Sequence, residues 1–215
     1  MFTDIIAERY LNELTRRYPA LAESTESLDK VYCSLKNVFF NQKTLFCCGN
    51  GGSASDCEHI VGELMKGFIS KRRLPAEELK KINEVAGEEG FAEKLQGGMR
   101  CISLLSHSGL NSAFTNDVDP LMTYAQQLYV LGREGDAILG ISTSGNAVNI
   151  CNAFKVAKAK GITTILMTGL NHGICEKYAD HILRGPEMET YKIQEYHLPI
   201  YHCLCLMLEE AFYGK

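Results

Sequence analysis

The sequence predicts an α/β fold in which a five-stranded parallel sheet is covered by helices on both faces. Apolar segments of strand length alternate with helical patterns along the whole chain. Two of these segments lead directly into turns rich in glycine and serine, and parallel sheets bind ligands beyond the carboxyl ends of their strands. The 215 residues, 46% of them hydrophobic, are enough for one well-buried domain over 1–215.

The expected strands are short and apolar, at 45–48, 101–105, 136–141, 163–167 and 181–183. A helical N-terminal extension, 1–42, precedes them, and a long helix over 192–212 ends the chain. The extension carries an apolar stripe from Leu21 to Phe39 that must be buried. This stripe could pack on the domain's own sheet or join a helical bundle between subunits.

Charge and composition exclude several classes of protein. A formal charge of −4 argues against a nucleic-acid binder, and the one basic cluster, 71–73, is interpreted as a solvated loop. Asp4, Glu8 and Glu13 interrupt the apolar N-terminus, which excludes a signal peptide and a membrane span and predicts a cytoplasmic protein. Nine cysteines, an odd number with no C-x-x-C pair, indicate buried thiols in a reducing compartment.

The turn after the first strand reads Cys48-Gly49-Asn50-Gly51-Gly52-Ser53-Ala54-Ser55-Asp56. Its glycines allow positive φ and close approach of a ligand to backbone N–H groups, and Ser53 is expected to cap the following helix. A Walker A loop would need a Lys-Ser/Thr pair where Ser53-Ala54 stands. A dinucleotide site would need an acidic residue after the next strand, and none is visible.

Two further groups of residues indicate chemistry. His59 and Glu63 are four residues apart on the helix after this turn, so they project from one face as a potential base and metal ligand. Ser142, Thr143 and Ser144 follow the strand at 136–141 and precede a helix at 147–160. Hydroxyls and backbone N–H groups at a helix start favour a phosphate, although a serine-rich turn without a ligand is the alternative.

These segments resemble the signatures of the phosphoheptose isomerases, a branch of the sugar isomerase (SIS) domain superfamily. The first is 48–56 with His59 and Glu63, the second is 141–146, and the third is Lys192-Ile193-Gln194-Glu195 followed by His197 and His202. They occur in the family's order and, with the strands between them, cover most of the chain outside 70–100. The resemblance implies an SIS-type three-layer sandwich, N-terminal helices in an oligomer bundle, and a homotetramer. It therefore favours burial of the stripe from Leu21 to Phe39 between subunits.

The resemblance also implies a reaction, the interconversion of sedoheptulose 7-phosphate and D-glycero-D-manno-heptose 7-phosphate through an enediol. Glu63 would be the base and His202 the acid or proton shuttle, and zinc would be held by His59, Glu63, Gln194 and His202. Gln194 and His202 are about 12 Å apart along an ideal helix, so a shared ligand must lie between their turns. The implied substrate-binding residues are Asn50, Gly51, Gly52, Ser53, Asn116, Asp117, Ser142, Thr143, Ser144 and Gln194.

The sequence departs from the family's pattern at three places. An insertion of about 70–100, with helical patterns near 76–85 and 91–95, could cap the site or decorate the surface. His107 stands where an aspartate is more usual, and Ala147 replaces a serine whose hydroxyl could contribute ~1.5–3 kcal/mol to phosphate binding. Asn116-Asp117 alone would be interpreted as a helix-ending turn or N-cap before Pro120, but its match to the family's Asn-Asp pair favours contact with sugar hydroxyls.

Two other functions compete with this one. A non-catalytic SIS protein that docks on a replication initiator is one alternative, but such a protein needs neither Glu63 nor His202. An isomerase or sensor for another sugar phosphate is the second alternative, and it is favoured by His107, Ala147 and the insertion.

Overall fold

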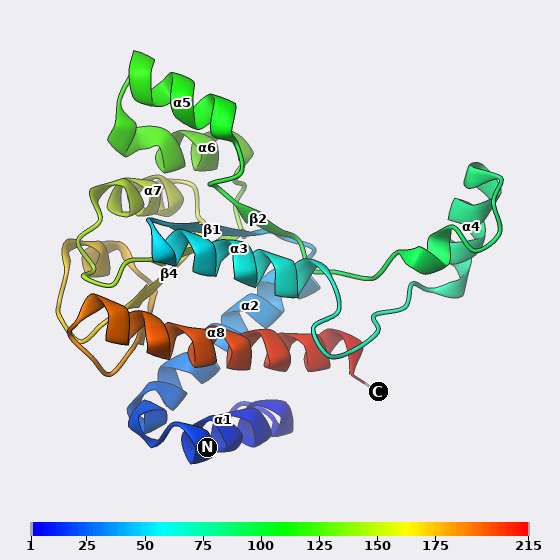
Figure 1. Cartoon of the computed structure of the whole chain (residues 1–215), viewed down its shortest axis with the longest axis horizontal. Coiled ribbons are helices and arrows are strands. Elements are labelled where there is room, and N and C mark those ends of the chain that lie inside the picture. Colours follow the sequence, from blue (N-terminus) through cyan, green and yellow to red (C-terminus); the bar gives the residue numbers. More distant parts are fainter. Residues whose placement is uncertain (1, 215) are drawn as a thin grey trace.

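A computed structural model describes residues 2–214 as one parallel sheet between helical layers (Figure 1). The strands are β1 (Leu45–Gly49), β2 (Cys101–Ser103), β3 (Ala137–Ile141), β4 (Thr163–Thr168) and β5 (His181–Arg184). The helices are α1 (Ile5–Arg17), α2 (Thr25–Phe40), α3 (Gly52–Met65), α4 (Ala76–Ala86), α5 (Ser108–Asp117), α6 (Thr123–Leu131), α7 (Val148–Ala159) and α8 (Thr190–Tyr213). The predicted strands and fold class are therefore confirmed, with β2 two residues shorter than expected.

The strand order is β2-β1-β3-β4-β5, and every pairing is parallel. In the pairing of β1 with β3, Gly49 lies opposite Ile141. The turns after these two residues therefore emerge side by side at one edge of the sheet. Both sequence motifs meet at the place where parallel sheets bind their ligands.

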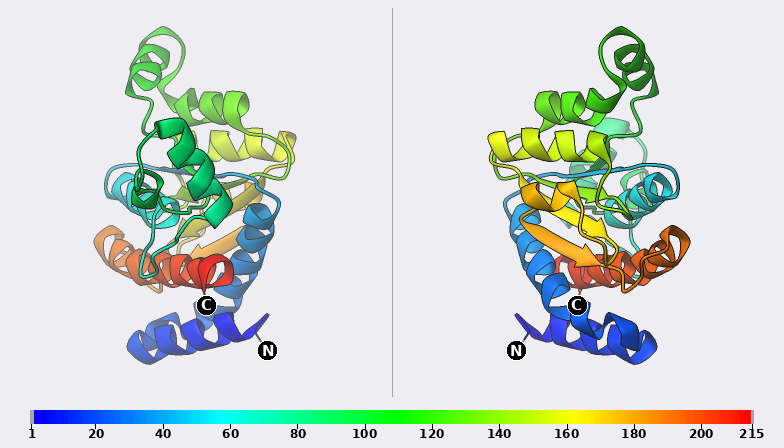
Figure 2. Two further views of the ribbon diagram at one scale, coloured as in Figure 1. Left: turned by 90° about the vertical axis from the view of Figure 1, so that its right-hand side faces the viewer. Right: turned by 90° about the vertical axis from the view of Figure 1, so that its left-hand side faces the viewer.

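Successive side chains of a strand point to opposite faces of the sheet, so alternate residues of each strand belong to two separate hydrophobic cores. Leu45 and Cys47 face the layer formed by α1, α2, α3 and α8, whereas Phe46 and Cys48 face α6 and α7. Figure 2 shows α7 and α8 on opposite sides of the sheet. Eight of the nine cysteines are buried and all nine are free thiols, which confirms the expectation of buried thiols.

The apolar stripe from Leu21 to Phe39, which runs along α2 and the turn before it, is buried within the chain itself. Leu21, Leu28, Val31 and Leu35 have no exposed surface, and α2 packs on α8 and β5. Of the two alternatives for this stripe, packing on the domain's own layers is the one that the structure shows. The preference for burial between subunits is wrong for these residues, so a subunit bundle would have to use other surfaces.

The insertion forms an arm that projects away from the body (Figure 1). It contains α4 and a 3-10 turn, Ala92–Lys94, close to the two predicted helical stretches. None of the residues of α4 is buried. The arm therefore stands beside the domain and does not cover the sheet edge that carries the two turns.

Arg72, at the root of the arm, corrects the expectation that 71–73 is a solvated loop. Its side chain has 0% exposure and lies 2.8 Å from the carboxylate of Glu209, which is also buried. That carboxylate accepts hydrogen bonds from the backbone N–H groups of Phe68, Ile69 and Ser70. Burial opposes its ionisation, but these N–H donors and Arg72 together lower the pKa of Glu209.

Among residues 2–214, no helix is both long enough and apolar enough to span a lipid bilayer.

Candidate active site

The glycine turn after β1 brings the chain into α3 by way of Gly51, whose φ of 56° is in the left-handed region. Helix α3 begins at Gly52, and no side chain caps it. The expected cap by Ser53 is therefore wrong, because Ser53 lies inside the first turn and donates its N–H to the Asn50 carbonyl (3.1 Å). Backbone groups, rather than a hydroxyl, shape this turn.

Gln194 of α8 lies against this turn. A Cβ atom added to Gly52 would stand 2.7 Å from Gln194 Nε2, so the glycine makes room for the amide. The structure thus brings together two of the predicted substrate-binding residues, Gly52 and Gln194, that are far apart in sequence. Their roles stay predictions.

The serine turn after β3 is folded by short-range hydrogen bonds. Ser142 is buried, and its Oγ accepts from the N–H of Ala147 at 3.4 Å. Ser144 is exposed, and its Oγ accepts from Asn146 N–H at 3.2 Å. Helix α7 starts after Ala147, whose methyl group cannot cap it. An anion at this turn would therefore meet an uncapped helix start and the exposed Ser144 hydroxyl.

A pair of amide side chains joins the two turns. Asn50 Nδ2 donates to Asn149 Oδ1 at 3.0 Å, and Asn149 Nδ2 donates back to Asn50 Oδ1 at 2.9 Å. The carbonyl before Asn50, that of Gly49, accepts a buried hydrogen bond from the Tyr124 hydroxyl at 2.6 Å. Asn149 was not among the residues that the sequence predicted.

The predicted acid and base lie across the contact between α3 and α8. Glu63, with 12% of its side chain exposed, has Oε1 at 3.2 Å from His59 Nε2 and Oε2 at 3.1 Å from Lys66 Nζ. The His59 and His202 rings lie edge to face, with 5.0 Å between their centres. Tyr201 holds the other side of the His59 ring through a hydrogen bond of 3.0 Å between its hydroxyl and His59 Nδ1.

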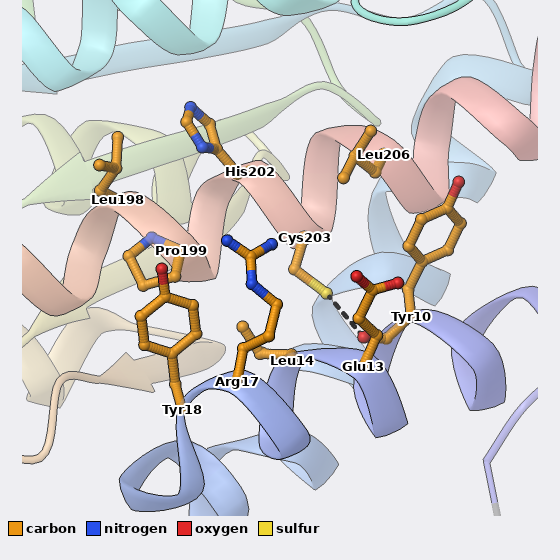
Figure 3. Close-up of a pocket in the computed structure, with 10 residues that line it drawn as sticks. All are labelled: Tyr10, Glu13, Leu14, Arg17, Tyr18, Leu198, Pro199, His202, Cys203 and Leu206. Atoms are coloured by element: carbon orange, nitrogen blue, oxygen red, sulfur yellow. Dashed lines mark hydrogen bonds between the residues drawn. The ribbon is translucent and has the colours of Figure 1, made fainter.

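The surroundings of His202 favour the neutral form of its imidazole by lowering its pKa. Burial lowers its pKa, and the neighbouring His59 and Arg17 lower it further, while Glu63 acts in the opposite direction. Its Nε2 atom is buried and has no hydrogen-bond partner among the described residues. Figure 3 shows Arg17 reaching from α1 toward α8 beside His202, at a cavity of about 110 Å³ between the two helices.

Two predicted substrate contacts lie apart from these groups. Asn116 and Asp117 are exposed at the end of α5, where Asn116 Nδ2 donates to Asp117 Oδ1 at 2.8 Å. Helix α5 packs on α6 and the 3-10 turn Pro120–Met122, outside the layer that covers the sheet (Figure 1). The pair ends helix α5, and within residues 2–214 no hydrogen bond joins it to the other predicted site residues. Its role in substrate binding stays a prediction. His107, before α5, is engaged with Gln127 Oε1 at 2.8 Å.

The four predicted zinc ligands separate into two groups. His59, Glu63 and His202 are adjacent and offer nitrogen and oxygen donors of the kind zinc accepts, whereas Gln194 lies at Gly52, near the other end of α3. Across residues 2–214, no three His, Cys, Asp or Glu side chains are arranged to hold a metal ion. The donor types of His59, Glu63 and His202 fit zinc, whereas Gln194 lies apart from these three, so no reaction step is assigned to a metal.

Sequence reasoning missed Lys66 and Arg72 as well as Asn149. Lys66 could have been found, since it is three residues after Glu63 on the same helix. Arg72 donates to the backbone carbonyls of Glu63 (2.8 Å) and Leu64 (2.6 Å), but its burial depends on Glu209, a distant partner for which the sequence carries no signal.

Comparison with known proteins shows the family to which the chain belongs. Residues 113–207 match the SIS domain. The chain is 35% identical to the phosphoheptose isomerase of Maridesulfovibrio salexigens over 80% of this chain and 71% of that protein. It is 30% identical to that of Helicobacter pylori over the full length of both. The structure of the Neisseria gonorrhoeae phosphoheptose isomerase superposes with a TM-score of 0.71 at 25% identity, covering 94% of this chain and 98% of that one. The chain therefore belongs to the phosphoheptose isomerase family.

Proposed function

We propose that this chain is the ketose–aldose isomerase that interconverts sedoheptulose 7-phosphate and D-glycero-D-manno-heptose 7-phosphate. The observation that carries the proposal is the placement of Glu63, a largely buried carboxylate, next to the His202 imidazole across the contact between α3 and α8. The phosphoheptose isomerase relatives supply the substrate class.

The reaction needs a base, a proton donor for oxygen, and a site for the phosphate. The Glu63 carboxylate removes a proton from C1 of the ketose, and the electron pair forms the enediol. His202 moves the hydroxyl proton between O1 and O2, for which a neutral imidazole is suited because it can donate its N–H. Glu63 then returns the proton to C2, which completes the aldose.

Two neighbours of Glu63 support its proposed role as the base. His59 and Lys66 contact its two oxygens and so fix the orientation of the carboxylate. Lys66 also places a positive charge beside a site where negative charge develops on oxygen. Ser142, Thr143 and Ser144 would receive the phosphate at the carboxyl edge of the sheet, where an uncapped helix start favours an anion.

The test is a panel of ketose and aldose phosphates followed by NMR, which identifies each product. We expect conversion of sedoheptulose 7-phosphate to the aldose heptose phosphate. Conversion of a different sugar phosphate only would favour the alternative substrate suggested by His107 and Ala147. Binding without any conversion would favour the replication-initiator-associating type of SIS protein, which the isomerase relatives do not favour.

Zinc is a separate proposal that rests on donor chemistry. His59 Nε2 and Glu63 Oε1 lie 3.2 Å apart, and both are donors of the kind that zinc accepts. Metal analysis of the purified protein tests the proposal, and it predicts one zinc per chain, lost in the variant His59→Ala. A metal-free protein with full turnover would contradict it.

A homotetramer is also proposed, by resemblance. Because the stripe of α2 is used inside the chain, we expect contacts through exposed apolar side chains such as Val118 and Tyr129, which are 67% and 64% exposed. Light scattering measures the mass directly. A stable and active monomer would contradict this proposal.

A further inference from the structure

We infer that Asn149 is a positioning residue that acts on substrate through Asn50. The inference rests on the proposed function, because it assigns Asn50 to the sugar-binding turn. Its basis is the pair of reciprocal hydrogen bonds, 3.0 and 2.9 Å long, between the two amide side chains.

The pair connects two segments that the sheet brings together. Asn50 follows the last residue of β1, and Asn149 is the second residue of α7, which follows β3 by way of the serine turn. The two strands are hydrogen-bonded neighbours. The amide pair therefore fixes the sugar-binding turn to the helix whose start is proposed to receive the phosphate.

The pair also fixes the direction of the Asn50 amide. Its Oδ1 accepts from Asn149, and one of its two Nδ2 hydrogens is donated to Asn149. An amide group carries two N–H donors, so one hydrogen of Asn50 Nδ2 remains free to donate. With the neighbouring Gly49 carbonyl held by Tyr124, the remaining N–H has a set direction in which to meet a sugar oxygen.

Asn149 is less free than Asn50 to reach the ligand, because Asn149 is half-buried whereas Asn50 is exposed. Its Oδ1 is shared between Asn50 Nδ2 and the N–H of Ile150, which lies 3.0 Å away, and its Nδ2 points to Asn50. Its contribution to binding should therefore exist only while Asn50 is present. This dependence separates a positioning residue from one that touches the substrate.

A double-mutant cycle tests the dependence. The variants are Asn50→Ala, Asn149→Ala and the double variant, with calorimetric binding of sedoheptulose 7-phosphate and the steady-state constants measured for each. We expect each single change to raise Kd and KM by roughly 3- to 10-fold, the scale of one or two hydrogen bonds, while kcat changes less. The double variant should be no worse than Asn50→Ala alone.

A matched control lies one turn further along the same helix. Asn152 donates to the Leu121 carbonyl at 3.2 Å, away from the two turns, so Asn152→Ala should leave Kd and KM unchanged. Circular dichroism and thermal unfolding check that all variants are folded.

Two results would overturn the inference. One is a double variant whose loss equals the product of the two single losses, which would give Asn149 its own contact or a general effect on the fold. The other is Asn149→Ala with unchanged Kd and KM. If the parent protein neither binds nor converts the sugar phosphate, the proposed function fails instead, so the two failures are distinguishable.

Discussion

Helix α3 begins and ends in opposite ways. Its first residue, Gly52, follows an open turn of neutral groups, where no side chain caps the helix. Its last turn contains Glu63 and contacts a buried ion pair. Arg72 donates to the backbone carbonyls of Glu63 and Leu64, and the same side chain donates to the carboxylate of Glu209. This difference supports the proposal that the first end receives the ligand and that the second end fixes the carboxylate of Glu63.

The two ends also differ in what a substitution should disturb. Groups at the first end are exposed or half-buried and bond through amides, so their loss should affect ligand binding more than folding. Groups at the second end are ionic and buried, and an unpaired buried charge is costly. Changes there should affect turnover and stability.

The largest effect is expected for the acid and base at the second end. Glu63→Gln and His202→Asn keep the size of each side chain and should lower turnover by roughly 10²–10⁴-fold, the usual scale of general acid–base catalysis. Steady-state kinetics with the sugar phosphate measures this loss. Glu58→Gln, an exposed position of the same helix, is the control and should keep the parent's turnover.

Next comes the ion pair at the root of the arm. Arg72→Met leaves the Glu209 carboxylate buried without its cation and should lower the free energy of unfolding by ~3–5 kcal/mol. Arg73→Met, at an exposed neighbour, should change it by less than about 0.5 kcal/mol. Urea denaturation measures both.

A double variant tests whether the unpaired Glu209 carboxylate causes the loss of stability in Arg72→Met. Arg72→Met with Glu209→Gln removes both charges, while the amide oxygen, placed where Oε2 stands, can still accept the N–H groups of Ile69 and Ser70. The double variant should be more stable than Arg72→Met. If it is less stable, the unpaired carboxylate is not the cause of the loss.

A smaller effect is expected at the serine turn next to the first end. Ser144→Ala removes an exposed hydroxyl and should raise KM for a sugar phosphate by about 10- to 150-fold, as expected for a hydrogen bond of ~1.5–3 kcal/mol to a charged group. The unfolding free energy should stay near that of the parent. An unchanged KM would place the phosphate elsewhere.

The smallest effect concerns the glycine that faces Gln194. Ala at position 52 would displace the end of a flexible side chain, so Gly52→Ala should fold and raise KM by about 2- to 10-fold, the scale of one hydrogen bond. A Cβ atom added to Gly62 would meet no other atom within 4 Å, so Gly62→Ala should keep KM. Because alanine has a higher helix propensity than glycine, this change should stabilise α3 by about 1 kcal/mol. Equal KM values for the two variants would mean that Gln194 does not contact the substrate.

The sequence predicted the sheet and the location of both turns because these depend on local signals. Apolar runs and glycines are read directly from neighbouring residues, and the parallel pairing of β1 with β3 then brings Gly49 and Ile141 to one edge. The meeting of Glu63 with His202 followed from the family resemblance, since no local pattern links positions so far apart.

Three features could not be predicted, and each depends on long-range contacts. The burial of Arg72 requires Glu209, which lies 137 residues away in the sequence. The basic cluster 71–73 contains no pattern that predicts such a distant partner. The stripe of α2 was expected between subunits, although α8 and β5 cover it within the chain. The pairing of Asn149 with Asn50 depends on the exact position where α7 begins, and helix boundaries are the least predictable feature of a sequence.

The most direct test of the account measures proton exchange in D₂O. The parent enzyme and Glu63→Gln are each incubated with sedoheptulose 7-phosphate, and NMR follows deuterium entering C1 of the ketose. The account predicts rapid exchange with the parent and a loss of roughly 10²-fold or more with Glu63→Gln, while calorimetry shows that the variant still binds the sugar phosphate. Exchange at the parent's rate in Glu63→Gln would contradict the assignment of Glu63 as the base.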